Sequence, residues 1–202
     1  MTSVPSRAER AKIKEYQDVA LSDRDLLYLL DGKANIVLYP DLAEMTSLDE
    51  VLGESGAAII LYCSKPSYGH WCALIRGVGD DYGKVEFFNP YGGFPDDSLE
   101  LLDPQWARRS KQDEPKLSLL MIDSPYELSY NQYPFQAYGR GIKTCGRHCA
   151  SRVLLRHLPL DAYAAAIYGE AEKTRTTPDA VVSAFTSEIA PKPKPILKGR
   201  RH

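Results

Sequence analysis

Residues 144–155 read Thr-Cys-Gly-Arg-His-Cys-Ala-Ser-Arg-Val-Leu-Leu, and this stretch decides the fold. A small polar residue, a cysteine and a glycine lead directly into apolar residues at helical spacing. The pattern predicts a buried helix over about 145–157, ended by Pro159, with one thiol at its start. The first N–H groups of a helix have no partner within the helix, and the helix dipole favours an anion there. Cys145 is therefore a candidate nucleophile, because these groups stabilise a thiolate.

Three apolar runs upstream of this helix predict a small antiparallel meander. Residues 57–63, 70–76 and 84–88 have strand length and are separated by connections rich in Ser, Pro and Gly. His70 opens the second run, and Asn89 follows the third. In a meander these two ends lie at the same edge of the sheet, so we expect the two side chains to be close together.

Capping residues and short apolar runs predict the remaining elements. Ser22 with Asp25, and Ser47 with Glu50, form capping-box patterns that start helices. The expected elements are a helix at about 23–31, a strand at 35–39, a helix from 47 to 52, a helix or strand at 116–122, a strand at 127–131, a helix at 161–168 stopped by Gly169, and a last helix at 178–190.

Bulk composition is that of one globular domain. The chain has 202 residues, of which 44% are hydrophobic and 26% charged, with a formal net charge of −2. No apolar run approaches the roughly 20 residues that cross a bilayer, and residues 1–17 lack the apolar core of a signal peptide. We therefore expect an intracellular protein without membrane contact, whose four cysteines, Cys63, Cys72, Cys145 and Cys149, are reduced.

Charge and proline content divide the chain into three parts. Residues 1–21 are polar and are expected to form an N-terminal extension, and residues 22–190 a single domain. Residues 191–202 carry five basic and no acidic side chains, punctuated by proline, which predicts a disordered basic tail. Such a tail suits weak contact with nucleic acid or an acidic partner, although a solvated terminus is the simpler interpretation.

A cysteine nucleophile needs a base, and the base needs a partner that orients its ring. His70 is the best base candidate, since it starts an apolar strand near the edge of the sheet. His148 competes because it lies three residues from Cys145 on the same helix. Asn89 is the candidate orienting residue: its side-chain oxygen can hold an imidazole without charge. Cys149, one turn beyond Cys145, is expected to point into the core.

The loop before the cysteine helix offers an oxyanion donor. Attack by a thiolate on an acyl group creates an oxyanion, and one well-placed donor stabilises the transition state by about 3 kcal/mol. Gln136 sits just before the segment that delivers Cys145, with Gln132 as an alternative four residues earlier. Gly146 permits close approach of a ligand backbone and is a candidate substrate-binding residue.

The order Gly69-His70-Trp71, a turn after a strand, Gln136 and Thr144-Cys145-Gly146 resembles a known superfamily. It is that of the SUMO/ubiquitin-like-protein proteases and the adenovirus maturation protease. The segment Tyr130-Asn131, Gln136, Thr144-Cys145-Gly146 and Cys149 is most similar to viral and transposon-encoded members. The resemblance covers about residues 22–160.

This resemblance implies a papain-like cysteine protease fold of the α+β class. Its small central sheet is mostly antiparallel and flanked by helices, with the nucleophile at the N-terminus of a central helix. It further implies Cys145 as nucleophile, His70 as general base, Gln136 as oxyanion donor and Trp71 as a cleft-lining aromatic residue. The acidic member of the family triad falls on Asn89, which departs from the usual Asp or Glu.

The function implied is cleavage of peptide or isopeptide bonds after small, glycine-containing residues, with no cofactor and no metal. The substrate would be a viral precursor or a conjugate of a ubiquitin-like modifier, in the host cytoplasm or nucleus or in the virion. Two alternatives stay open at this point. One is a zinc site built on Cys145, His148 and Cys149 together with Cys72 or His70 from the sheet. The other is a non-catalytic module that binds a ubiquitin-like protein or nucleic acid.

Overall fold

The computed structural model describes residues 4–189 apart from residues 67 and 140. The basic tail predicted at 191–202, with the nucleic-acid contact suggested for it, lies outside these residues. The α-helices are α1 (Arg7–Gln17), α2 (Asp23–Leu30), α3 (Leu48–Leu52), α4 (Pro104–Arg109), α5 (Lys116–Ile122), α6 (Cys145–Leu154), α7 (Leu160–Thr174) and α8 (Pro178–Ile189). The strands are β1 (Asn35–Leu38), β2 (Ala57–Lys65), β3 (Tyr68–Arg76), β4 (Lys84–Phe88) and β5 (Glu127–Tyr130).

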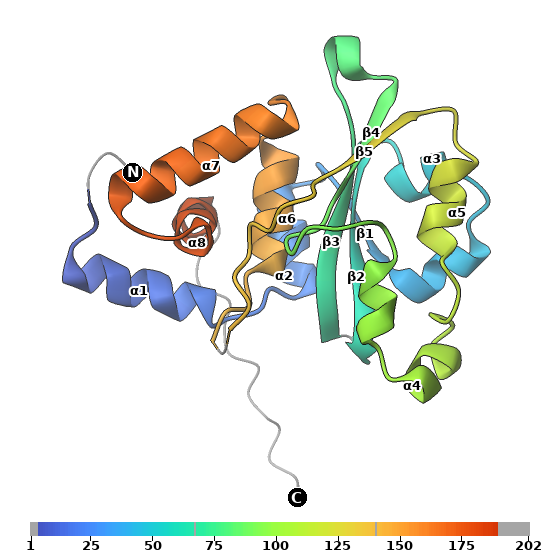
Figure 1. The fold of residues 1–202 in the computed structure, drawn as a ribbon, viewed down its shortest axis with the longest axis horizontal. Coiled ribbons are helices and arrows are strands. Elements are labelled where there is room, and N and C mark those ends of the chain that lie inside the picture. The colour runs from blue at the N-terminus through green and yellow to red at the C-terminus, as the bar shows by residue number, and fades with distance from the viewer. Residues whose placement is uncertain (1–3, 67, 140, 190–202) are drawn as a thin grey trace, which may run out of the picture.

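The five strands form one mixed sheet in the order β1-β2-β3-β4-β5 (Figure 1). The predicted antiparallel meander is confirmed for β2, β3 and β4. The outer pairs β1–β2 and β4–β5 are parallel, so the expectation of a mostly antiparallel sheet is wrong for the edges. The cause is the length of the connections between these strands. α3 lies between β1 and β2, and α4 and α5 lie between β4 and β5. Connections of this length allow the chain to cross over and run in the same direction again.

Helices cover both faces of the sheet, which explains why β2 is apolar at almost every position. Ile59 and Leu61 face a core formed with α2, α6 and α7, whereas Ile60 and Tyr62 face a second core formed with α3 and α5. Successive strand residues point to opposite faces, so a strand covered on both sides needs a continuous apolar run. Figure 1 shows α6 and α2 on one side of the sheet and α3 and α5 on the other.

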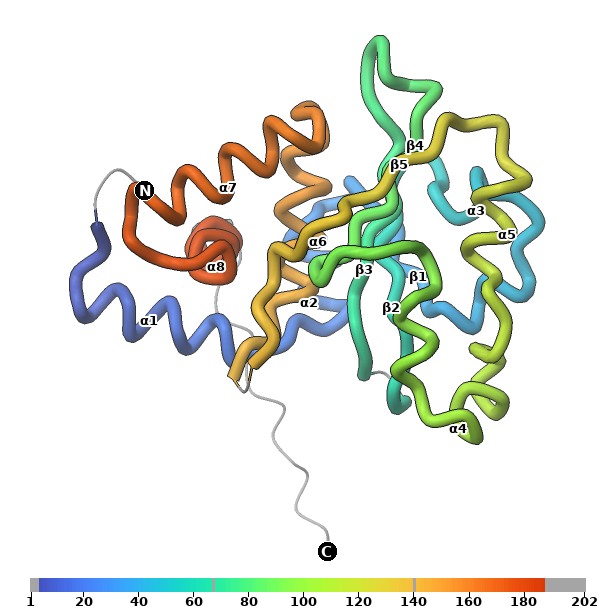
Figure 2. The backbone as a smooth tube through the Cα atoms, viewed as in Figure 1, coloured from blue at the N-terminus to red at the C-terminus, as the bar shows by residue number. Residues whose placement is uncertain are grey.

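The helices α1, α7 and α8 complete the layer that contains α6. α8 packs against α1, α6 and α7, and in Figure 2 α1 and α7 lie on either side of it, away from the sheet. α1 falls within the stretch that was expected to be an N-terminal extension. Its Ile13 and Tyr16 are nevertheless buried, and the Tyr16 carbonyl accepts a hydrogen bond from Arg147 Nε at 3.2 Å.

Most predicted elements are present, with three informative differences. Residues 116–122, left open between helix and strand, form α5. α7 does not stop at Gly169 but continues to Thr174, since the residues after the glycine tolerate the helix, and Arg175 ends it with a left-handed backbone. Glu50 bonds to Thr46 rather than completing a capping box with Ser47. Within the described residues, no helix has the length and apolar character to span a bilayer.

Candidate active site

A cavity of about 440 Å³ opens between the sheet and the start of α6. Four of the residues singled out in the sequence, His70, Trp71, Gln136 and Cys145, line it. Apolar side chains from α2, β1 and β2 form much of the remaining wall: Leu27, Ile36, Leu38 and Leu61. The structure thus gathers residues from β3, from the loop after β5 and from α6, which are separated by up to 75 positions in the chain.

Cys145 is the first residue of α6, as predicted. The side chain is buried, with 8% of the residue exposed. Burial raises the pKa of the Cys145 thiol, although the backbone N–H groups of Trp71 and Gly146 act in the opposite direction. The N–H groups at the helix start thus lower the pKa of the thiol, as expected, while burial raises it by more.

His70 and Asn89 are hydrogen-bonded at 2.9 Å, from His70 Nε2 to Asn89 Oδ1. The same Oδ1 accepts the backbone N–H of Tyr91 at 3.0 Å, which fixes the orientation of the amide. Nε2 must therefore carry the proton and donate it, and Nδ1 is the ring nitrogen left without a proton in the neutral side chain. Burial lowers the pKa of His70 to about 4; the Asn89 bond raises it only in part, and His148 lowers it further. The resting imidazole is neutral.

Asn89 itself is held by a second asparagine. Its backbone N–H donates to Asn131 Oδ1 at 2.8 Å, and Asn131 Nδ2 donates to the Asn89 carbonyl at 2.7 Å. Both residues are almost fully buried. These two hydrogen bonds join the end of β4 to the end of β5, so the Asn89 amide that orients His70 is rigidly held.

Tyr91 contacts three of the predicted residues and was not singled out in the sequence. Its ring stacks on the His70 ring at 4.7 Å between centroids, with an interplanar angle of 20°. Its backbone binds Asn89, and its hydroxyl accepts a hydrogen bond from Gln136 Nε2 at 3.1 Å. The sequence feature that could have indicated Tyr91 is its position two residues after Asn89, in an Asn-Pro-Tyr-Gly turn.

Gln136 is the better placed of the two glutamine candidates. It is buried and lines the cavity, whereas Gln132 is exposed and does not. The loop is fixed by Pro90, whose carbonyl accepts the backbone N–H groups of Phe135 and Gln136, both at 2.8 Å. The amide of Gln136 thus faces the same cavity as Cys145.

Trp71 and Gly146 meet next to the cavity. Trp71 donates its indole N–H to the Leu21 carbonyl at 3.1 Å. A Cβ at Gly146 would lie 3.2 Å from Trp71 Cδ1 and 3.3 Å from Leu21 Cβ, which is a tight fit. Gly146 therefore has a packing reason to be glycine, and it does not line the cavity. Contact between Gly146 and a substrate stays a prediction.

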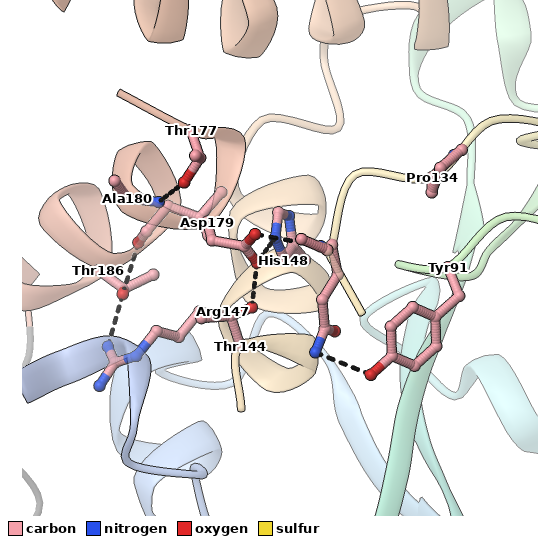
Figure 3. A network of polar contacts seen from close by, with 12 residues as sticks. Tyr91, Pro134, Thr144, Arg147, His148, Thr177, Asp179, Ala180 and Thr186 are labelled. Atoms are coloured by element: carbon pink, nitrogen blue, oxygen red, sulfur yellow. Dashed lines mark hydrogen bonds and ion pairs between the residues drawn. The ribbon is translucent and has the colours of Figure 1, made fainter. Parts of the chain in front are cut away.

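His148 is placed away from the cavity, in a buried polar cluster between α6 and α8 (Figure 3). Its Nε2 lies 3.1 Å from Asp179 Oδ1. Cys149 points elsewhere, with its Sγ 3.2 Å from the Trp71 carbonyl. In the part of the chain that the structure describes, no group of three His, Cys, Asp or Glu side chains is arranged to hold a metal ion. Asp179 was not singled out in the sequence.

Comparisons with known proteins give one close relative. No model of a known protein family matches the sequence. The uncharacterized protein V9 of Sputnik virophage is 41% identical over 175 residues, which cover 87% of this chain and 98% of that protein. The chain belongs to the V9 family. A virus-encoded protein is thus among the relatives of this V9-family chain.

Solved structures resemble the V9-family chain only distantly. The central domain of the uncharacterized Lpg1148 protein from Legionella pneumophila has a TM-score of 0.39 at 16% identity, covering 84% of this chain and 94% of that one. SUMO protease Ulp1 with its catalytic cysteine oxidized to a sulfinic acid has a TM-score of 0.38 at 14% identity, with coverages of 92% and 99%. The Ulp1 protease domain in complex with Smt3, the yeast ortholog of SUMO, gives 0.36 at 12%, with coverages of 91% and 97%.

Proposed function

We propose that this chain is a cysteine endopeptidase with a papain-like fold, in which Cys145 is the nucleophile and His70 the general base. One observation carries the proposal: His70, hydrogen-bonded to Asn89 through Nε2, lines the same cavity as Cys145 and Gln136. A nucleophile, an oriented base and an amide donor at one cavity are the parts that acyl transfer requires.

The chemistry follows from these roles. Cys145 Sγ attacks the substrate carbonyl carbon while its proton passes to His70 Nδ1, and the Gln136 amide with the Cys145 backbone N–H stabilises the oxyanion. Collapse of the tetrahedral intermediate breaks the C–N bond, and His70 donates the proton to the leaving amine. Water, activated by His70, then hydrolyses the thioester and restores the free thiol. Because burial raises the pKa of the Cys145 thiol and lowers that of His70 to about 4, we expect proton transfer to accompany attack rather than precede it.

The substrate we propose is a protein cut after small, glycine-containing residues. The motif order that resembles ubiquitin-like-protein proteases and the adenovirus maturation protease supports this class, and the virophage relative supports a viral setting. A viral precursor, in the virion or in the host cytoplasm or nucleus, is then the first substrate to test. A conjugate of a ubiquitin-like modifier is the second.

A vinyl-sulfone probe ending in Gly-Gly tests the assignment. We expect covalent labelling of the wild-type protein at Cys145, no labelling of Cys145→Ala, and retained labelling of Cys149→Ala, whose thiol faces the Trp71 carbonyl. Intact-mass and peptide mass spectrometry measure the adduct. Labelling that persists in Cys145→Ala would refute the nucleophile.

A non-catalytic binding module is the second candidate, favoured by the uncharged amide at Asn89 and by the burial that raises the pKa of the Cys145 thiol. It predicts that a ubiquitin-like protein binds without turnover or probe adduct. Cleavage profiling on a peptide library, with ubiquitin and SUMO precursors alongside, separates the two functions.

A further inference from the structure

Asp179, at the start of α8, accepts hydrogen bonds from Thr144 and Ala137 and lies beside His148 in the buried cluster between α6 and α8 (Figure 3). Its Oδ1 accepts from the Thr144 hydroxyl and lies 3.1 Å from His148 Nε2. Its Oδ2 accepts the backbone N–H of Ala137 at 3.1 Å. Thr144 directly precedes Cys145, and Ala137 directly follows Gln136. One carboxylate therefore joins the two segments that carry the proposed nucleophile and the proposed oxyanion donor.

The contact with Thr144 also changes the start of α6. A threonine at the N-cap normally turns its hydroxyl inward to accept a first-turn N–H. Thr144 makes no such bond, and its hydroxyl lies against Asp179, to which it donates. The N–H groups at the start of α6 are therefore not occupied by the cap. They remain available to the sulfur of Cys145 and, in the proposed reaction, to the oxyanion.

The contact between Ala137 and Asp179 fixes the second segment, the Gln136–Ala137 peptide. Pro90 accepts the N–H of Gln136, and Asp179 accepts the N–H of the next residue. Two successive backbone N–H groups are thus hydrogen-bonded, one to Pro90 after β4 and the other to Asp179 in α8. The peptide that carries the Gln136 side chain has little freedom to rotate away from the cavity.

A buried carboxylate is expensive unless it is fully hydrogen-bonded. Asp179 is only 1% exposed. Burial raises the pKa of the Asp179 carboxyl, but the bonds from His148, Thr144 and Ala137 outweigh burial and lower it below its ordinary value. Its place in the first turn of α8 adds the favourable end of a helix dipole. An apolar residue would hold two helices together without this desolvation cost. A carboxylate at this position is therefore better explained by the hydrogen bonds that it accepts from particular groups.

We propose that Asp179 is a positioning residue: its carboxylate holds the Thr144–Cys145 turn and the Gln136–Ala137 peptide in the geometry that makes Cys145 reactive. The proposal rests on the proposed function for the meaning of that reactivity. α8 lies outside residues 22–160, for which the superfamily resemblance holds, so the resemblance assigns no role to this residue.

Site-resolved alkylation by iodoacetamide, followed by peptide mass spectrometry across a pH series, tests the proposal without any substrate. In Asp179→Asn one side-chain oxygen cannot replace both acceptors, and the freed Thr144 hydroxyl can cap α6. In Thr144→Val the hydroxyl contact is lost alone. We expect Cys145 alkylation at neutral pH to slow by about tenfold in Asp179→Asn, and by less in Thr144→Val. The midpoint of its pH profile should move upward in both.

Two variants serve as controls. Thr144→Ser keeps the hydroxyl and should restore the wild-type rate. Thr186→Val removes a buried hydroxyl of α8 that accepts from Arg147 Nη1 at 2.7 Å, so it weakens the α6–α8 contact without touching either segment of the site. It should lower the melting temperature and leave Cys145 alkylation unchanged.

Two results would overturn the proposal. One is wild-type Cys145 alkylation in both Asp179→Asn and Thr144→Val. The other is faster alkylation of Cys145 together with the buried Cys149, which is the signature of a residue that merely stabilises the fold. If Asp179→Asn does not fold, Thr144→Val decides alone. Alkylation needs no proteolysis, so failure of the Gly-Gly probe on the wild-type protein would refute the proposed function while leaving this test intact.

Discussion

His70 and His148 each direct Nε2 at a side-chain oxygen, at 2.9 Å and 3.1 Å, and differ in almost everything else. His70 lines the cavity and its partner is the neutral amide of Asn89. His148 is fully buried and its partner is the carboxylate of Asp179. The stronger partner, the carboxylate, thus belongs to the histidine that does not reach the cavity.

This difference separates two tasks that a triad acid combines. A carboxylate beside His70 would both orient the ring and raise its pKa, favouring imidazolium. Asn89 orients the ring without charge, so the pKa of His70 stays low, at about 4, under the effect of burial. The charge of Asp179 acts instead on the backbone around Cys145 and Gln136. Orientation of the base and placement of the nucleophile are therefore assigned to different halves of the site.

The largest expected effect comes from removing each of the two histidines in turn and comparing the rates of probe labelling. His70→Ala should lower Gly-Gly probe labelling by about 10²–10⁴-fold, because the proton acceptor is lost. His148→Ala should lower labelling by less than about tenfold and reduce the melting temperature, since one donor to Asp179 is lost. Labelling rates and thermal unfolding measure both. The reverse order of the two rates would make His148 the base.

A second prediction concerns stability against pH. The folded-state pKa of His70 is about 4, below its ordinary 6.5, so between these values the unfolded chain binds more protons than the folded one. Stability should therefore fall as the pH decreases from 6.5 to 4, by up to about 3 kcal/mol. Urea unfolding of wild type and His70→Ala over this range measures the contribution. Parallel curves for the two proteins would contradict it.

A smaller effect is expected from giving His70 a charged partner. Asn89→Asp keeps the oxygen that accepts from His70 and Tyr91 and replaces the amide nitrogen by a second oxygen. The pKa of His70 should rise, and the acid limb of probe labelling should move to higher pH with it. Asn89→Ala, which removes the acceptor, should slow labelling by about tenfold without that shift. An unchanged acid limb in Asn89→Asp would show that another group governs it.

Sequence patterns predict the parts of this molecule that depend on neighbours along the chain. The apolar runs specify β2, β3 and β4, and the meander then brings His70 and Asn89 to one edge. Ser22 with Asp25 caps α2 as expected. The start of α6 at Cys145 follows from the change to helical periodicity. Each of these signals acts over a few residues or one hairpin, which is why they can be read from the sequence.

The parts that could not be predicted depend on distant contacts. Thr177-Pro178-Asp179 is a typical helix start, where an aspartate is explained by the helix dipole alone. Nothing local indicates that its carboxylate reaches Thr144, 35 positions away. The pKa of Cys145 likewise depends on burial by other elements, and the direction of β1 and β5 on how their crossovers pack.

The position of Asp179 near the end of the described chain has a consequence for synthesis. The His70–Asn89 contact spans 19 residues and belongs to the meander, whereas Asp179 contacts Ala137 across 42 residues. Chains fold from the N-terminus as they are made. A nascent chain therefore holds the histidine, the amide and the thiol well before the carboxylate joins them. Under the positioning role proposed for Asp179, the geometry around the thiol is then complete only after α8 has been made and has packed against α6.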